Sequence, residues 1–181
     1  MQKIQIPMER AKKLADSEAL MRSLRRVCHC QVAFEEENIV TIEGADAYEE
    51  YSAKNIVAAY GRGFDVNIAQ RLMKEDYYFQ IIDIRQLFSN KKRAREIKAR
   101  LIGTDGRAKR YIEVVSSAKI AIYGDTVSII GRPDEIAEAE AAIKSIINGT
   151  GHRKAYTRME ASHRKHTEER RTAGMVADRS G

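Results

Sequence analysis

The spacing of hydrophobic residues changes several times along the second half of the chain, and each change predicts a new element. Residues 77–84 are rich in aromatic and β-branched side chains, which are typical of a strand. Two stretches with apolar residues three and four apart and two short alternating stretches follow, at 94–101, 108–115, 119–123 and 126–130. Pro133, followed by Asp134 and Glu135, is typical of a helix start. The pattern predicts the order strand, helix, helix, strand, strand, helix.

The first half of the chain repeats this pattern at an offset of 87 residues. The offset aligns Leu14 with Leu101, Val27 with Val114, and Gly44 with Gly131. Strands are expected near 3–6, 30–34 and 39–43, and helices from residue 8, through 20–24 and over 45–60. We therefore expect an α+β protein with two tandem units, each a three-stranded antiparallel sheet covered by three helices.

Charge adds a candidate partner. The formal net charge is +6 and the sequence pI is about 9.3, which favours a polyanionic ligand. Basic residues number 11 against 12 acidic ones in 1–75, 13 against 10 in 76–148, and 8 against 4 in 149–181. The densest basic cluster is Lys91, Lys92, Arg93, Arg95, Lys98, Arg100, Arg107, Lys109 and Arg110. Such a cluster fits nucleic acid, although a solvated helix face has the same composition.

The break between the two helices of the second unit has the sequence Gly103-Thr104-Asp105-Gly106. Two glycines three apart let backbone N–H groups approach a ligand, and a helix N-terminus with basic residues follows directly. A KH domain holds about four single-stranded nucleotides with such a GxxG loop. The residues we expect to contact RNA are Arg100, Ile102, Gly103, Thr104, Asp105, Gly106, Arg107, Lys109, Arg110, Ile112, Ile120 and Ile122. GxxG alone also fits a helix C-cap followed by a turn.

The second half of the chain resembles a known family through several short motifs. They are Gly61-Arg62-Gly63-Phe64, Glu75-Asp76-Tyr77-Tyr78, Ile81-Ile82-Asp83, Lys91-Lys92-Arg93, Leu101-Ile102-Gly103, Gly106-Arg107, Tyr123-Gly124, Val127–Gly131, and Gly149-Thr150-Gly151-His152 with Tyr156. These motifs resemble the archaeal two-KH ribosome-assembly proteins related to eukaryotic Dim-two, also called partner of Nob-one. The resemblance covers about residues 1–160 and is strongest from residue 55 onward.

The resemblance implies two tandem type I KH domains, at 1–62 and 77–148, with a connector helix at 63–76. It implies a cytoplasmic RNA-binding factor that holds the 3′ region of the small-subunit ribosomal RNA precursor. Implied partners are the Nob-one endonuclease, a dimethyladenosine transferase and an initiation factor α subunit. Residues 149–181 are expected to form a basic tail, helical from about 156 to 171 and frayed over 172–181.

The first unit departs from the family pattern. At the position of its GxxG loop the chain has Asp16-Ser17-Glu18-Ala19, which lacks both glycines and adds two negative charges. We therefore expect a degenerate KH domain that serves packing or protein contact.

Other chemistry has weaker support in the sequence. Cys28-His29-Cys30 fits a metal ligand pair or buried core thiols, and His163 and His166 with Glu160 fit a metal site or a charged helix face. The Tyr77-Tyr78-Phe79 cluster is either a base-stacking platform or half core.

No P-loop, catalytic set, cofactor or membrane-spanning apolar run is recognisable, so we expect no enzyme, no metal and no membrane. Two alternatives to an assembly factor remain. One is a protein–protein adaptor on ribosomal particles with only non-specific RNA affinity, and the other is a KH regulator of messenger RNA.

Overall fold

The computed structural model describes residues 1–88 and 90–177, with side chains as far as residue 169. The chain forms two compact units. The first consists of Met1–Leu87 and Lys119–Ile130, and the second of Phe88–Ala118 and the chain from Gly131 onward. The predicted residues 178–181 of the frayed tail lie outside the described residues.

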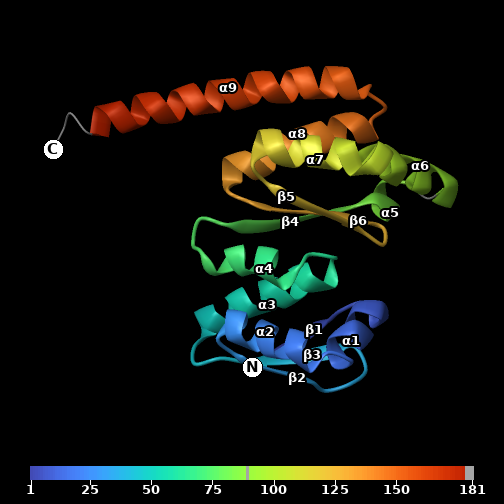
Figure 1. The fold of residues 1–181 in the computed structure, drawn as a ribbon, viewed down its shortest axis with the longest axis vertical. Helices are drawn as coiled ribbons and strands as arrows, with labels where there is room; N and C mark the ends of the chain where they lie inside the picture. Colours follow the sequence, from blue (N-terminus) through green and yellow to red (C-terminus); the bar gives the residue numbers. More distant parts are fainter. Residues whose placement is uncertain (89, 178–181) are drawn as a thin grey trace. The chain divides into compact units, whose positions relative to one another are not determined.

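The first unit holds all six strands of the described chain and five α-helices (Figure 1). Its elements are β1 (Gln2–Gln5), α1 (Met8–Ala15), α2 (Glu18–Cys28), β2 (Gln31–Phe34), β3 (Ile39–Glu43), α3 (Ala47–Gly61), α4 (Val66–Ala69), the 3-10 helix η1 (Gln70–Met73), β4 (Tyr78–Asp83), α5 (Ile84–Leu87), β5 (Lys119–Tyr123) and β6 (Thr126–Gly131). The strands form two three-stranded sheets, ordered β1-β3-β2 and β4-β6-β5. Strand β3 is antiparallel to β1 and β2, and β5 is antiparallel to β6.

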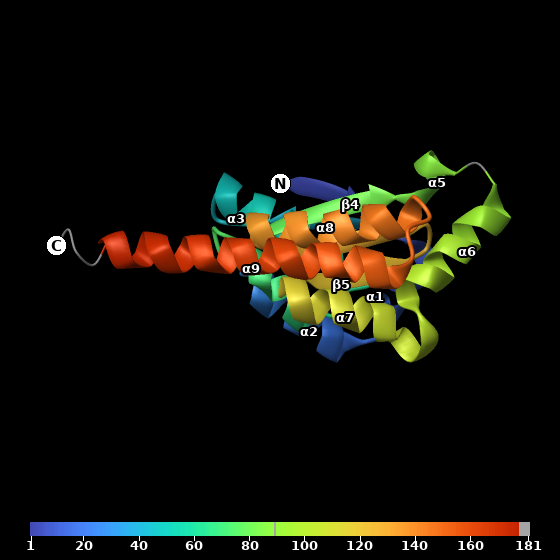
Figure 2. The same ribbon diagram turned by 90° about the horizontal axis from the view of Figure 1, so that it is seen from above.

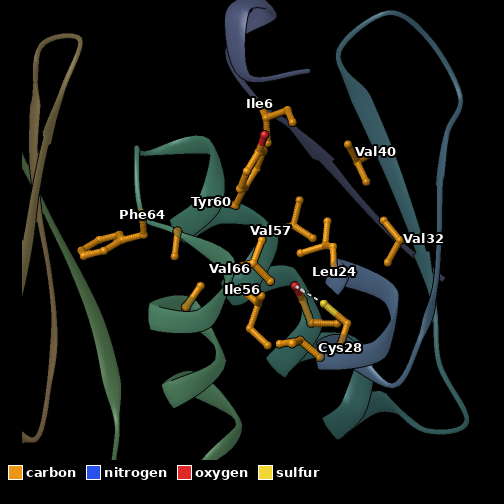
Figure 3. Close-up of a cluster of buried hydrophobic side chains, with 14 of the residues drawn as sticks. Ile6, Leu24, Cys28, Val32, Val40, Ile56, Val57, Tyr60, Phe64 and Val66 are labelled. Carbon is orange, nitrogen blue, oxygen red and sulfur yellow. Dashed lines mark hydrogen bonds between the residues drawn. The ribbon is translucent and has the colours of Figure 1, made fainter. Parts of the chain in front are cut away.

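The core of the first unit lies between its first sheet and the helices α1, α2 and α3 (Figure 3). Alternate strand residues such as Val32 and Val40 point into it, and Leu24 of α2 and Val57 of α3 meet them. These side chains are at most 3% exposed, because strands bury every second residue and helices bury one stripe. The predicted arrangement of three helices over a three-stranded sheet is confirmed for this half of the chain.

The second sheet packs against the connector of the same unit. Ala121 and Ile130 belong to the core cluster that contains Phe64, and the Phe64 and Phe79 rings meet edge to face at 6.3 Å. The Tyr123 hydroxyl donates a hydrogen bond to Glu9 at 2.8 Å. Packing thus divides the chain differently from the predicted domain boundaries, which follow the order of the elements.

The second unit is helical. It contains α6 (Lys91–Ile102), the 3-10 turn η2 (Thr104–Gly106), α7 (Arg107–Ser116), α8 (Pro133–Ile147) and α9 (His152–Ala177). Helix α9 lies along α7 and α8 (Figure 2) and buries Ala155 and Met159. Helix α9 begins four residues before the predicted tail helix, because these apolar residues pack its first turns against α7 and α8. It also extends six residues beyond the predicted end at residue 171.

Both halves of the chain have the order β-α-α-β-β-α, with the short elements α4, η1 and α5 added between or within them. The offset of 87 residues places Ile39, the start of β3, on Thr126, the start of β6. The sheet orders repeat in the same way, with the last strand in the centre of each sheet. Among the described helices, none combines the length and the apolar character that crossing a bilayer requires.

Candidate nucleic-acid interface

The GxxG sequence forms the junction of α6 and α7. Gly103 caps α6 with φ 70° and ψ 176°, and the turn Thr104–Gly106 follows with Asp105 at φ 52° and Gly106 at φ 73°. Helix α7 begins at Arg107, and no side chain of the described residues caps its N-terminus. Because the first N–H groups of a helix lack partners within the helix, this end favours an anion.

The two glycines have different surroundings. A Cβ atom at Gly103 would lie 2.7 Å from the Cβ of Ala108 and 2.8 Å from its backbone nitrogen. A Cβ atom at Gly106 would meet only the Arg110 side chain, 3.6 Å away. Gly103 therefore permits the close approach of the loop to α7, whereas Gly106 keeps the outer face of the loop open.

Among the cations beside the loop, Arg107 is held most loosely. The Arg107 guanidinium lies 4.0 Å from the Asp105 carboxylate, and both side chains are more than 70% exposed. Arg110 donates to the backbone oxygen of Asp105, and Lys109 lies 3.3 Å from a Glu113 carboxylate oxygen. Exposed ion pairs contribute only about 0–1 kcal/mol, so a phosphate can replace the Asp105 carboxylate as the partner of Arg107.

Arg100 differs from the other predicted contacts. Its guanidinium donates to the backbone oxygens of Ile146 at 3.1 Å and Thr150 at 2.8 Å. Ile146 lies in the last turn of α8, where carbonyl oxygens lack intrahelical donors, and Thr150 lies in the segment between α8 and α9. Arg100 therefore joins α6 to the end of α8, and only its remaining N–H groups are available to a ligand.

The predicted apolar contacts do not form one exposed set. Ile102 is 39% exposed, whereas Ile112 is 1% and Ile120 is 3% exposed. Ile120 and the partly exposed Ile122 lie on β5, which belongs to the first unit. RNA contact by these residues stays a prediction, and the side chains of Ile112 and Ile120 lie in the interior.

A hollow of about 490 Å³ lies directly beside the loop. Its walls come from the end of α6, the loop and the first turns of α7 and α9. The polar and aromatic lining residues are Arg100, Thr104, Arg107, His152 and Tyr156, and the others are alanine or glycine. Sequence reasoning gave His152 and Tyr156 no role, although both belong to the motif after the second unit that carries the family resemblance.

The aromatic side of the hollow is ordered by its neighbours. Nε2 of His152 lies 2.8 Å from the backbone oxygen of Arg100, so this nitrogen is the donor. The Tyr156 ring lies 5.8 Å from the His152 ring and 4.2 Å from the Tyr111 ring. The Tyr111 hydroxyl donates to Glu160, and this bond, with burial, raises the pKa of Tyr111. Burial likewise raises the pKa of Tyr156, so both phenols are neutral at physiological pH.

The corresponding turn of the first half has a side-chain cap at its helix start and no glycine. Helix α1 ends at Ala15, and the Ser17 hydroxyl accepts a hydrogen bond from the Leu20 N–H at 3.3 Å at the start of α2. Glu18 follows with its side chain 84% exposed. The Leu20 N–H is therefore already bonded within the chain, and the Glu18 carboxylate lies near it in the first turn of α2.

The other sequence candidates are explained by packing. Cys28 and Cys30 are buried free thiols, and burial, followed by the nearby Cys30, raises the pKa of Cys28 to about 12. His163 and His166 both bond the buried carboxylate of Glu138, at 2.9 Å and 2.8 Å, instead of Glu160. Within the described part of the chain, no three His, Cys, Asp or Glu side chains are placed to hold a metal ion.

The Tyr77-Tyr78-Phe79 cluster is half core. Tyr77 and Phe79 are partly buried against the core of the first unit, and Tyr78 is 55% exposed. Tyr77 lies near the cations of Arg71 and Lys74, at 6.0 Å and 5.7 Å. A continuous stacking platform of three rings is therefore absent at this site.

Sequence comparison identifies the second half of the chain. Residues 78–164 match the family model of a eukaryotic-type KH domain, KH-domain type I. A KH domain-containing protein of Methanocaldococcus jannaschii is 30% identical over 167 residues, which cover 90% of this chain and 74% of that protein. The pre-rRNA-processing protein pno1 of Aspergillus fumigatus is 34% identical over 107 residues, 57% of this chain and 42% of that protein.

Solved structures agree with this assignment. Dim2p from Pyrococcus horikoshii has a TM-score of 0.79 and 30% identity, covering 88% of this chain and 98% of that one. A chain in the complex of the initiation factor 2α subunit, Dim2p and rRNA from the same organism has a TM-score of 0.82 and 28% identity, covering 91% and 94%. This chain therefore belongs to the KH-domain family of Dim2p and the PNO1 proteins.

Proposed function

We propose that the chain is an assembly factor of the small ribosomal subunit that binds single-stranded RNA near the 3′ end of the small-subunit rRNA precursor. The observation that carries this proposal is the loop Gly103–Gly106, whose open glycine face and uncapped helix start are flanked by exposed cations. The names of the relatives support the process: the fungal proteins are named for pre-rRNA processing, and a Pyrococcus relative was solved with rRNA.

We further propose that both halves of the chain are type I KH domains and that only the second binds RNA. The repeated element order and the repeated sheet order support the duplication. The self-capped turn at Ser17 and the exposed Glu18 support a first domain that serves packing or protein contact. The boundaries expected from the sequence, 1–62, 63–76, 77–148 and 149–181, remain part of this proposal.

The proposal includes partners and a location. The Pyrococcus complex contains an initiation factor 2α subunit, which makes the same subunit a partner to test here. The Nob-one endonuclease and the dimethyladenosine transferase are proposed on the family resemblance, as is the cytoplasmic location. No catalytic step is part of this proposal, which assigns the loop a role in positioning RNA and in supplying charge.

The test is a gel-shift titration of Gly106→Asp against short single-stranded RNAs. Gly106 already has a positive φ and open space around its Cβ position, so the fold should survive while the new carboxylate repels phosphate. Gly124→Asp is the matched control, because Gly124 also has a positive φ and an empty Cβ position but lies in the β5–β6 turn. We expect Gly106→Asp to abolish binding and Gly124→Asp to keep it.

The same titration distinguishes the alternatives. An assembly factor should favour the 3′-terminal sequence of small-subunit rRNA. An adaptor should show only weak binding that increases in proportion to RNA length, and a messenger RNA regulator should favour other sequences. If Gly106→Asp binds RNA with wild-type affinity and has an unchanged circular dichroism spectrum, the loop Gly103–Gly106 is not the RNA-binding site.

A further inference from the structure

The hollow beside the GxxG loop is lined by residues that phosphate binding at the loop does not require. It adds two aromatic side chains of α9, His152 and Tyr156, to a wall formed by the loop and by Arg100 and Arg107. None of its lining residues is acidic. Its volume of about 490 Å³ falls within the roughly 300–1,000 Å³ of small-ligand pockets.

The cationic side of the hollow is partly preorganised. The Arg100 guanidinium is held by two backbone carbonyls, that of Ile146 in the last turn of α8 at 3.1 Å and that of Thr150 between α8 and α9 at 2.8 Å. Arg107 is 78% exposed and pairs only loosely with Asp105, at 4.0 Å. Arg153 and Lys154, in the first turn of α9, are exposed and add further positive charge. A ligand in this hollow would thus meet fixed and mobile cations together, which favours a phosphate group.

The aromatic side is ordered as well. His152 is fixed by its bond to the backbone oxygen of Arg100, and Tyr156 is fixed by its contact with the Tyr111 ring. Rings that are already ordered lose little conformational freedom when a flat ligand stacks on them. Bases stack on aromatic side chains in this way in many single-stranded RNA sites.

We propose that this hollow binds one nucleotide next to those held by the GxxG loop, with its base against Tyr156 and His152 and its phosphate near Arg107 and Arg100. This inference rests on the proposed RNA-binding function and extends it by one position. It gives the start of α9, which follows the second predicted KH unit, a direct part in RNA recognition. An acidic peptide would use the cations but not the rings, so the aromatic lining favours a nucleotide.

Fluorescence anisotropy with three RNAs tests the subsite. One RNA has about four nucleotides, the length that a KH loop holds, and the others extend it by one nucleotide at either end. One extension should strengthen binding by wild-type protein about tenfold, the effect expected for one stacked base. Tyr156→Leu should lose this gain and keep the affinity for the short RNA, whereas Tyr156→Phe, which retains the ring, should keep both.

A second measurement guards against a packing defect in Tyr156→Leu. A photoreactive uridine placed at the extending position should crosslink to His152 or Tyr156 in the wild-type protein. The subsite is excluded if neither extension adds affinity, if Tyr156→Leu keeps the gain, or if the crosslinks fall outside the first turns of α9. If the short RNA itself does not bind to wild-type protein, the proposed function fails and the subsite fails with it.

Discussion

The two glycines of the loop predict opposite responses to the same substitution. At Gly103, φ 70° with ψ 176° lies in a region that is nearly exclusive to glycine and costs other residues about 1–3 kcal/mol. The new Cβ of Gly103→Ala would also lie 2.7 Å and 2.8 Å from atoms of Ala108, and such overpacking costs about 1–3 kcal/mol more. Alanine also lowers the conformational entropy of the unfolded chain, which offsets about 0.4–1 kcal/mol of this loss in stability. The net loss expected for Gly103→Ala is therefore about 1–6 kcal/mol.

Gly106→Ala is the internal control for this prediction. Its φ of 73° and ψ of 15° are left-handed, which costs about 1–2 kcal/mol, and its Cβ would meet no atom closer than 3.6 Å. After the same unfolded-state correction, the loss should be about 0–2 kcal/mol. Urea denaturation followed by circular dichroism measures both free energies of unfolding. Equal losses for the two variants, or a larger loss for Gly106→Ala, would refute the assignment of Gly103 to packing and Gly106 to the open face.

Three further predictions follow from the described contacts. Glu138→Ala removes the buried carboxylate that bonds His163 and His166, and it should destabilise the packing of α9 by about 1–3 kcal/mol. Amide hydrogen exchange in α9 should become faster in this variant, whereas the control Glu140→Ala should leave the exchange rate nearly unchanged. Because the pKa of Cys28 is raised to about 12, its thiol should resist iodoacetamide at mildly alkaline pH until the chain unfolds; rapid alkylation in mass spectrometry of the native protein would contradict its burial. Changing Asp16 and Glu18 together to alanine should leave RNA affinity unchanged, and a large change in anisotropy titrations would show that the first domain contacts RNA.

The order of the elements was predictable because local patterns and tertiary packing agree along most of the chain. The offset of 87 residues aligns the two halves from the sequence alone, and in the structure it places the start of β6 on the start of β3. The short helix α5 (Ile84–Leu87) was not predicted, because Ile81, Ile82 and Ile84 continue the β-prone pattern up to its first residue. The extent of α9 was also missed, since its first turn depends on contacts with α7 and α8.

The candidate site was predictable as a loop but not as a surface. Gly103 and Gly106 carry a local signal, because positive φ depends on the residue itself. The exposure of Ile112 and the partners of Arg100 are set by distant segments, such as Ile146 and Thr150 for Arg100. For the same reason no local pattern indicates a role for the rings of α9 beside the loop.

Crosslinking in cells followed by sequencing of the bound RNA and mass spectrometry of the crosslinked peptide tests the central claim most directly. The account predicts that the RNA comes from the 3′ region of the small-subunit rRNA precursor and that the crosslinked peptide contains residues 103–110. RNA drawn evenly from many transcripts, or crosslinks confined to the first half of the chain, would contradict it.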